Sequence, residues 1–407
     1  MLNKIRNKKI TNGILKYFYL CISILFSWPV FSQYKLTVVL NEVPASHIRD
    51  TIFIAGNFNG WNPGNADYQF QAKDSIRVVE LKGLNAGTYE FKFTRGSWGK
   101  VESLAGGTDV TNHVIKLTSD TSLYYSVAGW ADDFAPLPKA HTASPNVQVL
   151  DTAFEIPQLN RYRRIWVYLP AAYSKSKKCY PVMYMQDGQN IFDEYTSAYG
   201  EWGVDENLDS LVTKGRPACI VVGIDNGGDT RMNEYNPYEF TRKNSVTSKT
   251  FLPEGDEYLA FISNTLKPFV DKHYRTLRSR ENTIIAGSSM GGLISYYALL
   301  KYPKVFGNAG VFSPAFWTAN EIDQLTDSLA GKLDAKLFFY MGDAEGKEDV
   351  DRMNGIIEKI GKKSSAMICL VIDPEGKHNE QAWRKWFAEF YKWIMADGFN
   401  VITNYRN

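Results

Sequence analysis

Cysteine is scarce in this chain, with four residues among 407, and no two of them have Cys-x-x-Cys spacing. So few cysteines exclude a disulfide-rich scaffold, and their spacing offers no zinc site. The clustered lysines and arginines of nucleic-acid-binding proteins are also missing. The sequence therefore predicts no metal, no cofactor and no nucleic-acid partner.

Acidic residues are absent from the first 32 residues, which carry five basic residues followed by an apolar run over 17–28. Those twelve residues are too few to cross the roughly 30 Å core of a bilayer as a helix. The pattern is typical of a signal peptide cleaved before Gln33, with an uncleaved anchor as the alternative. We expect a periplasmic or secreted protein without stable membrane insertion, whose net charge changes from +2 to −3 when the leader is removed.

The remaining chain falls into two parts with different patterns. Short β-rich runs separated by Gly, Asn and Asp over residues 33–131 predict a small all-β, immunoglobulin-like sandwich. Residues 132–146 are rich in Pro, Ala and polar residues, which indicates a linker. From 147 to 402 strands alternate with helices, and this alternation predicts an α/β domain with a mostly parallel sheet covered on both faces.

One serine of the α/β part lies in the context of a nucleophile. Residues 284–292 read Ile-Ile-Ala-Gly-Ser-Ser-Met-Gly-Gly, an apolar strand followed directly by a helical pattern. Only Ser289 has glycines at both offsets of the Gly-x-Ser-x-Gly turn of α/β-hydrolases, although a bare match could be an ordinary glycine-rich turn. At the start of a helix, the N–H of Met290 would face the oxyanion of a tetrahedral intermediate.

A serine nucleophile needs a base and an orienting acid, in the chain order Ser, acid, His. His378 is the one histidine downstream of Ser289, and it follows the predicted strand 368–372. Asp349 and Asp351 are more distant acids in this interval, while the strand ending near Met341 runs into Gly-Asp-Ala-Glu-Gly, which makes Asp343 and Glu345 the two close candidates. Spacing alone does not choose between these two carboxylates.

Four separated segments then resemble an esterase family that includes esterase D, enterochelin esterases, feruloyl esterases, acetyl xylan esterases and mycolyl transferases. These segments are 185–192, 200–205, 287–292 and 376–383. The resemblance implies the α/β-hydrolase fold, Ser289 and His378 in the roles given above, and Glu345 rather than Asp343 as the acid. It also implies that Gln189 supplies the second oxyanion N–H and that the cleft is bordered by Trp202, Arg231, Glu234 and Tyr235.

The N-terminal part has a resemblance of its own. Residues 55–61 (Ala-Gly-Asn-Phe-Asn-Gly-Trp) and 92–98 are similar to the starch- and glycogen-binding β-sandwiches of amylolytic enzymes. In such modules two tryptophans stack on sugar faces while a lysine and an asparagine bond the hydroxyls, which implies Trp61, Lys92, Trp98 and Asn112 here. Because related modules also occur as non-binding spacers, glycan binding is one of two alternatives.

Together these features predict an exported serine esterase that removes acetyl or feruloyl groups from a polysaccharide or oligosaccharide, held near its substrate by the N-terminal module. Cleavage of a siderophore ester and acyl transfer to a sugar are the alternative reactions, since both use the same serine. A glycan-binding protein with an inactive hydrolase domain is the alternative outside catalysis.

Overall fold

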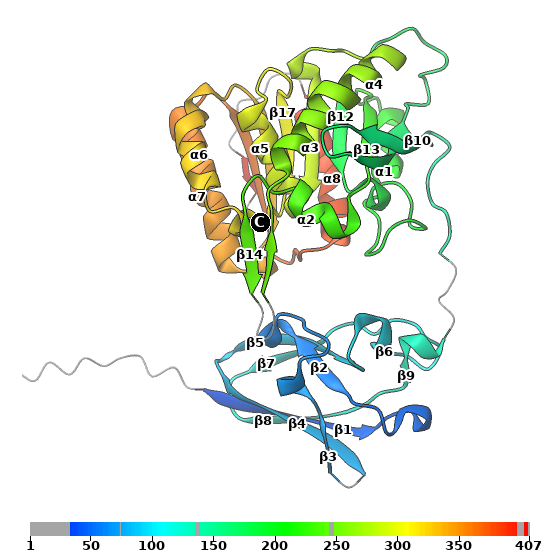
Figure 1. Cartoon of the computed structure of the whole chain (residues 1–407), viewed down its shortest axis with the longest axis vertical. Coiled ribbons are helices and arrows are strands. Elements are labelled where there is room, and N and C mark those ends of the chain that lie inside the picture. Colours follow the sequence, from blue (N-terminus) through cyan, green and yellow to red (C-terminus); the bar gives the residue numbers. More distant parts are fainter. Residues whose placement is uncertain (1–32, 74, 135–138, 244–247, 397–402, 406–407) are drawn as a thin grey trace, which may run out of the picture. The chain divides into compact units, whose positions relative to one another are not determined.

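The computed structural model describes residues 33–73, 75–134, 139–243, 248–396 and 403–405, and the expected leader lies outside these ranges. The chain divides into two compact units, residues 1–137 and 138–407, which are described separately below. Figure 1 shows the β-rich first unit in blue to cyan and the mixed second unit in green to red.

Unit 1 is a β-sandwich. Its strands are β1 (Tyr34–Glu42), β2 (Phe53–Gly56), β3 (Gln71–Lys73), β4 (Ile76–Leu84), β5 (Gly87–Thr94), β6 (Glu102–Ser103), β7 (His113–Leu117), β8 (Thr121–Ser126) and β9 (Gly129–Trp130). One sheet has the order β3-β4-β1-β8 and the other β2-β5-β7, while β6 pairs with β9. Alternate residues of both sheets, such as Val38 and Phe91, enter one shared apolar core, as period-two alternation requires.

Unit 2 contains a nine-stranded sheet. Its strands are β10 (Val147–Ile156), β11 (Arg161–Tyr168), β12 (Val182–Gln186), β13 (Ile220–Ile224), β16 (Thr283–Ser288), β17 (Asn308–Phe312), β18 (Lys336–Gly342), β19 (Met367–Asp373) and β20 (Thr403–Tyr405). Their order is β10-β11-β13-β12-β16-β17-β18-β19-β20. Pairing is antiparallel from β10 to β13 and parallel beyond, so the carboxyl ends of β12, β16, β18 and β19 meet at one edge.

Helices cover both faces of this sheet. They are α1 (Val204–Thr213), α2 (Arg231–Glu234), α3 (Gly255–Phe261), α4 (Lys267–His273), α5 (Met290–Lys301), α6 (Ile322–Leu329), α7 (Lys347–Lys363) and α8 (Glu380–Ile394). Buried residues of α3 to α7 form one apolar cluster and those of α1 and α8 form another, on opposite faces of the sheet (Figure 1). The three layers are the arrangement that strand-helix alternation predicts, and the expected fold class is confirmed.

Several elements differ from the sequence-based expectation. The helical spacing of Leu259, Ile262, Leu266 and Phe269 predicts one helix over 257–270. In the structure this segment is α3 and α4 joined by a π-helical stretch, Ile262–Leu266. Helices α1 and α6 and the hairpin of β14 (Phe240–Lys243) and β15 (Ser248–Phe251) were not anticipated. Among the described residues, β14 and β15 form a two-stranded sheet outside the main sheet. Neither strand has the continuous apolar run that marks the buried strands of the main sheet in the sequence.

The segment expected as a linker is partly held by acidic side chains of unit 2. The N–H of Thr142 donates to Asp193 at 3.0 Å, and the N–H of Ser144 donates to Asp205 at 2.6 Å. The Asn146 amide group also donates to Asp209, at 2.7 Å. These bonds fix residues 142–146 at the start of β10, which explains why unit 2 begins before the expected boundary at 147.

Candidate active site

Ser289 lies at a strained turn between β16 and α5. Its φ is 57° and its ψ −122°, a positive-φ conformation that a non-glycine residue rarely adopts. The turn is held because the N–H of Ser289 donates to Phe312 O at 2.9 Å, while Ser289 O accepts from the N–H groups of Leu293 and Ala315, each at 3.0 Å. Strain retained by such bonds is characteristic of sites where a side chain must be presented in a fixed direction.

The glycines around Ser289 are required by close backbone approach. A β-carbon at Gly287 would lie 2.8 Å from Gln186 Cγ, and one at Gly292 would lie 2.8 Å from Phe312 O. A β-carbon at Gly291 would lie 3.0 Å from Gln186 Cβ. The sequence Gly-x-Ser-x-Gly-Gly therefore reflects packing of the turn against β12 and β17, independently of any chemistry.

His378 and Glu345 are paired at the same edge of the sheet. Glu345 ends the 3₁₀ turn Asp343–Glu345 that follows β18, and His378 lies between β19 and α8. The His378 Nδ1 atom is 2.6 Å from Glu345 Oε2. A carboxylate at Nδ1 fixes the tautomer in which Nε2 is free to accept a proton.

The Glu345 carboxylate is held by two further donors. Its Oε1 accepts from the N–H of Gly342 at 2.9 Å and from the hydroxyl of Ser313 at 2.6 Å. Ser313 in turn accepts from Trp383 Nε1 at 2.9 Å. Asp343, the competing acid, is exposed to solvent. Of the two candidates left open by spacing, Glu345 is the one that the structure brings to His378.

Ser289 and His378 line one cavity of about 260 Å³. The residues lining it are Ser289, Ser313, Pro314, Ala315, Trp317, Met341, Glu345, Asp349 and His378. Ser313 and Trp317 were not anticipated from the sequence, whereas Asp349 was noted there only as a more distant acid between Ser289 and His378. The polar residue directly after an apolar strand was the available indication for Ser313, whose φ of 43° also marks it as unusual.

The two expected oxyanion donors come from different segments, Met290 from the start of α5 and Gln189 from the turn that follows β12. Met290 is the first residue of α5, where a backbone N–H has no partner within the helix. Gln189 belongs to the turn Gly188–Asn190, and this turn is anchored because Gln189 O accepts from Thr196 Oγ1 at 2.7 Å and Gln189 Oε1 from the N–H of Asn226 at 3.1 Å. Donors fixed in this way could stabilise an oxyanion without reorganising.

Arg231, one of the four residues expected to border the cleft, forms an ion pair close to the turn of the nucleophile. Its guanidinium binds Asp187 through Nε at 2.6 Å and Nη2 at 2.9 Å, and Asp187 Oδ2 lies 3.2 Å from where a β-carbon of Gly291 would be.

Glu380 is 8% exposed, and burial raises its pKa to about 7, with the nearby Asp187 carboxylate adding to the increase. Glu380 lies in the segment 376–383 that carries the family resemblance, and no role for it follows from the sequence.

Trp202, Glu234 and Tyr235 are at most 3% exposed. Trp202 packs edge-on against Phe312, with ring centroids 5.0 Å apart. Glu234 binds Arg163 and Arg161 at 2.7 and 2.8 Å, and Tyr235 OH accepts from the N–H of Asp187 at 3.2 Å. These contacts favour a structural role, in which the three buried side chains stabilise the residues around the cleft. Direct contact of these side chains with substrate stays a prediction.

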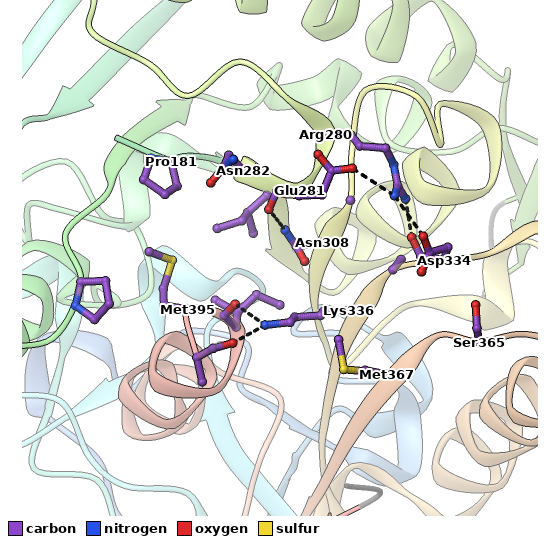
Figure 2. Close-up of a pocket in the computed structure, with 16 residues that line it drawn as sticks. Pro181, Arg280, Glu281, Asn282, Asn308, Asp334, Lys336, Ser365, Met367 and Met395 are labelled. Atoms are coloured by element: carbon purple, nitrogen blue, oxygen red, sulfur yellow. Dashed lines mark hydrogen bonds and ion pairs between the residues drawn. The ribbon is translucent and has the colours of Figure 1, made fainter. Parts of the chain in front are cut away.

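A second cavity, of about 510 Å³, lies at the amino ends of the parallel strands (Figure 2). Three of its polar side chains donate to backbone carbonyls: Arg280 to Pro303 O at 2.6 Å, Asn308 to Glu281 O at 2.7 Å, and Lys336 to Ile394 O at 3.4 Å. These bonds join the chain ends that precede the strands. The polar groups of this cavity therefore have a structural role, and their arrangement does not resemble a catalytic site.

In unit 1 the two expected sugar-stacking tryptophans are neighbours. The ring centroids of Trp61 and Trp98 are 6.2 Å apart, Trp98 is 43% exposed, and Trp61 has a φ of 58°. Lys92 pairs with Asp109 at 3.0 Å, and the Asn112 amide group donates to Glu90 at 3.0 Å. The structure thus brings the tryptophans together, while glycan binding by this group stays a prediction.

Within the described residues, no three His, Cys, Asp or Glu side chains are grouped so that they could hold a metal ion. None of the helices in this part of the chain is long and apolar enough to cross a membrane.

Residues 156–394 match the protein family described as "Putative esterase". The chain belongs to this family. Protein YbbA of Bacillus subtilis is 27% identical to this esterase over 250 residues, which are 59% of the chain and 95% of that protein. The endo-1,4-β-xylanase/feruloyl esterase of Xylanibacter ruminicola is 25% identical over 347 residues, or 79% of the chain and 43% of that enzyme.

Solved structures are similar in fold. The enterobactin esterase FES of Shigella flexneri has a TM-score of 0.53 at 15% identity, and the match covers 89% of this esterase and 93% of that chain. Family membership and fold together confirm the expected enzyme class, a serine esterase acting on carboxylic esters. The resemblance of unit 1 to starch- and glycogen-binding modules is not tested by these matches.

Proposed function

We propose that this esterase removes acyl groups from a carbohydrate, outside the cytoplasm, through an acyl-enzyme formed on Ser289. The observation that carries the proposal is the placement of three groups: Ser289 at a strained helix start, His378 in the same cavity, and Glu345 at 2.6 Å from His378 Nδ1. Each group is held by bonds of the fold, so the constellation does not depend on substrate.

The proposed reaction follows from these positions. Ser289 Oγ attacks the ester carbonyl while His378 Nε2 takes its proton, and Glu345 stabilises the resulting imidazolium. The N–H groups of Met290 and Gln189 bind the oxyanion. His378 then protonates the leaving alcohol, and a water molecule, deprotonated by the same imidazole, releases the acid from Ser289.

A carbohydrate ester is supported as substrate by two observations. The relative from Xylanibacter ruminicola is named as a xylanase and feruloyl esterase, and unit 1 presents the paired Trp61 and Trp98. An aromatic pair suits a pyranose, which has an apolar face and a polar rim. The basic, apolar N-terminal segment supports the proposal of export, since a polysaccharide substrate would lie outside the cell.

Replacing the nucleophile tests the proposal. We expect Ser289→Ala to abolish release of acetate from acetylated xylan and of ferulate from feruloylated arabinoxylan, and to abolish labelling by a fluorophosphonate probe. Ser288→Ala is a matched control, because Ser288 is the neighbouring serine at the end of β16. Undiminished turnover in Ser289→Ala would refute the assignment, and cleavage of a catecholate trilactone alone would transfer it to the siderophore esters.

A further inference from the structure

Trp317 is a half-exposed tryptophan in the cavity that contains Ser289 and His378. Its side chain is 47% exposed, whereas most large apolar side chains of unit 2 are buried. It lies in the 3₁₀ turn Phe316–Thr318, after β17. An indole ring left open beside a nucleophile is a surface on which a flat ligand could stack.

The turn that carries Trp317 is fixed from several directions. Arg352 of α7 donates to Phe316 O at 3.1 Å, and the Asn236 amide group donates to Thr318 O at 3.1 Å. The Phe240 ring meets the Trp317 ring edge-on, with centroids 6.1 Å apart and an angle of 89°. Phe240 itself is stacked on Phe251 across the β14–β15 hairpin, at 4.9 Å. The ring is therefore held in place before any ligand binds.

Asp349 brings a carboxylate to the same cavity. It lies in the first turn of α7, three residues before the Arg352 that holds the Trp317 turn. Burial raises the pKa of Asp349, and the neighbouring Glu345 carboxylate raises it further. The His378 Nδ1 atom is paired with Glu345, and the partly exposed Asp349 carboxylate lines the cavity, where a ligand hydroxyl could donate to it.

We propose that Trp317 and Asp349 form a subsite for a hydroxylated six-membered ring of the substrate. The ring face stacks on the indole, and a ring hydroxyl donates to the Asp349 carboxylate. Such a ring could be the phenol of an aromatic acyl group or the sugar that carries the ester. This inference rests on the proposed function, because it assigns a substrate part to the cavity of Ser289.

The test compares ring-bearing esters with an ester that has no ring. Methyl ferulate represents the phenol, a monoacetylated xylopyranoside represents the sugar, and ethyl acetate is the reference, each followed by titration of the released acid. We expect Trp317→Ala to lower the kcat/KM of one ring-bearing ester, relative to ethyl acetate, at least tenfold. Trp317→Tyr should retain most of this ratio, because it keeps an aromatic face. The ester whose ratio falls identifies the source of the ring.

Asp349→Ala tests the hydroxyl contact. If the ring is the phenol, the preference of the enzyme for methyl ferulate over methyl 3,4-dimethoxycinnamate should fall at least fivefold; if it is the sugar, the preference for the xylopyranoside over ethyl acetate should fall. Tyr162→Ala and Glu348→Ala serve as controls, since Tyr162 is 65% exposed on β11 and Glu348 is exposed next to Asp349. Both should keep the wild-type ratios.

The outcomes separate this inference from the proposed function. If the wild-type enzyme hydrolyses ethyl acetate and the Trp317 and Asp349 variants keep all ratios, the subsite is refuted while the ester hydrolase stands. If no ester is hydrolysed and Ser289 does not react with a fluorophosphonate, both are refuted.

Discussion

Gly342 and Gly376 pack backbone to backbone next to the proposed catalytic pair. A β-carbon on Gly342 would lie 2.9 Å from Gly376 Cα, and one on Gly376 would lie 2.8 Å from Gly342 Cα. Because Gly342 precedes the turn of Glu345 and Gly376 precedes His378, this approach sets the distance between the acid and the base. The Ala344 N–H donates to Gly376 O at 3.3 Å across the same contact.

Gly376→Ala should therefore separate His378 from Glu345. We expect kcat/KM for ethyl acetate to fall about 100-fold, as a displacement near 1 Å suffices for such a loss. The free energy of unfolding should fall by roughly 1–3 kcal/mol, because the added methyl group overfills the contact. Gly355→Ala in α7 is the control, since a β-carbon there meets nothing within 4 Å and the change favours a helix. Full activity in Gly376→Ala would contradict the role given to this contact.

Glu345→Gln and Asp343→Asn distinguish the two acids that the sequence left open. Glu345→Gln removes the charge that stabilises the imidazolium and favours the wrong tautomer, so we expect kcat to fall roughly 10³- to 10⁴-fold. Asp343→Asn should stay within about twofold of the wild type, because Asp343 is exposed. Steady-state kinetics with ethyl acetate measures both. A larger loss in Asp343→Asn would assign the acid to the other carboxylate.

The sequence predicted those features of the site that are local, and it missed those that arise from contacts between distant segments. Ser289 could be found because strand, glycines and helix adjoin within nine residues. The choice of Glu345 depends on which carboxylate of the turn after β18 contacts His378 in the loop after β19. The order of residues in the sequence does not give the distance between these two side chains. Ser313 and Trp317 are separated from His378 by more than 60 residues. Trp317 carries no pattern by itself, and the position of Ser313 after an apolar strand does not show which residue it contacts.

Ser313 is expected to act as a positioning residue for Glu345. Ser313→Ala removes the 2.6 Å bond to Glu345 Oε1 and leaves the Trp383 indole N–H without its acceptor. A hydrogen bond to a charged group contributes about 1.5–3 kcal/mol, so kcat should fall by at least tenfold while KM changes little. Ser313→Gly is the matched variant, since glycine tolerates the φ of 43°. Equal losses would attribute the effect to the hydroxyl, whereas recovery in Ser313→Gly would attribute it to the backbone.

Glu380 should make stability depend on pH. Burial raises the pKa of this carboxyl from its ordinary value of 4.5 to about 7. The folded protein therefore binds a proton that the unfolded chain has lost between those values, and the free energy of unfolding should fall as pH rises from about 4.5 to 7. At about 1.4 kcal/mol per pKa unit, the decrease approaches about 3 kcal/mol.

Glu380→Gln should remove this decrease. Urea unfolding of the wild type and the variant at pH 4.5, 6 and 8 measures the difference, which should grow with pH in favour of Glu380→Gln. The control is Glu389→Gln, because Glu389 lies on the same helix with a side chain that is 50% exposed. Parallel stability curves for Glu380→Gln and wild type would show that the carboxyl is charged in the folded protein.

Trp61 and Trp98 should carry any glycan affinity of unit 1. Trp61 keeps a φ of 58°, in a region that a bulky side chain seldom occupies, and its ring lies 6.2 Å from that of the exposed Trp98. We expect Trp61→Ala and Trp98→Ala each to weaken retardation in native gels containing xylan or soluble starch by about tenfold, since each removes a stacking face. Tyr124→Ala on β8 is the control, as Tyr124 is 66% exposed outside this pair. If the wild type migrates equally with and without every glycan tested, unit 1 is a non-binding spacer.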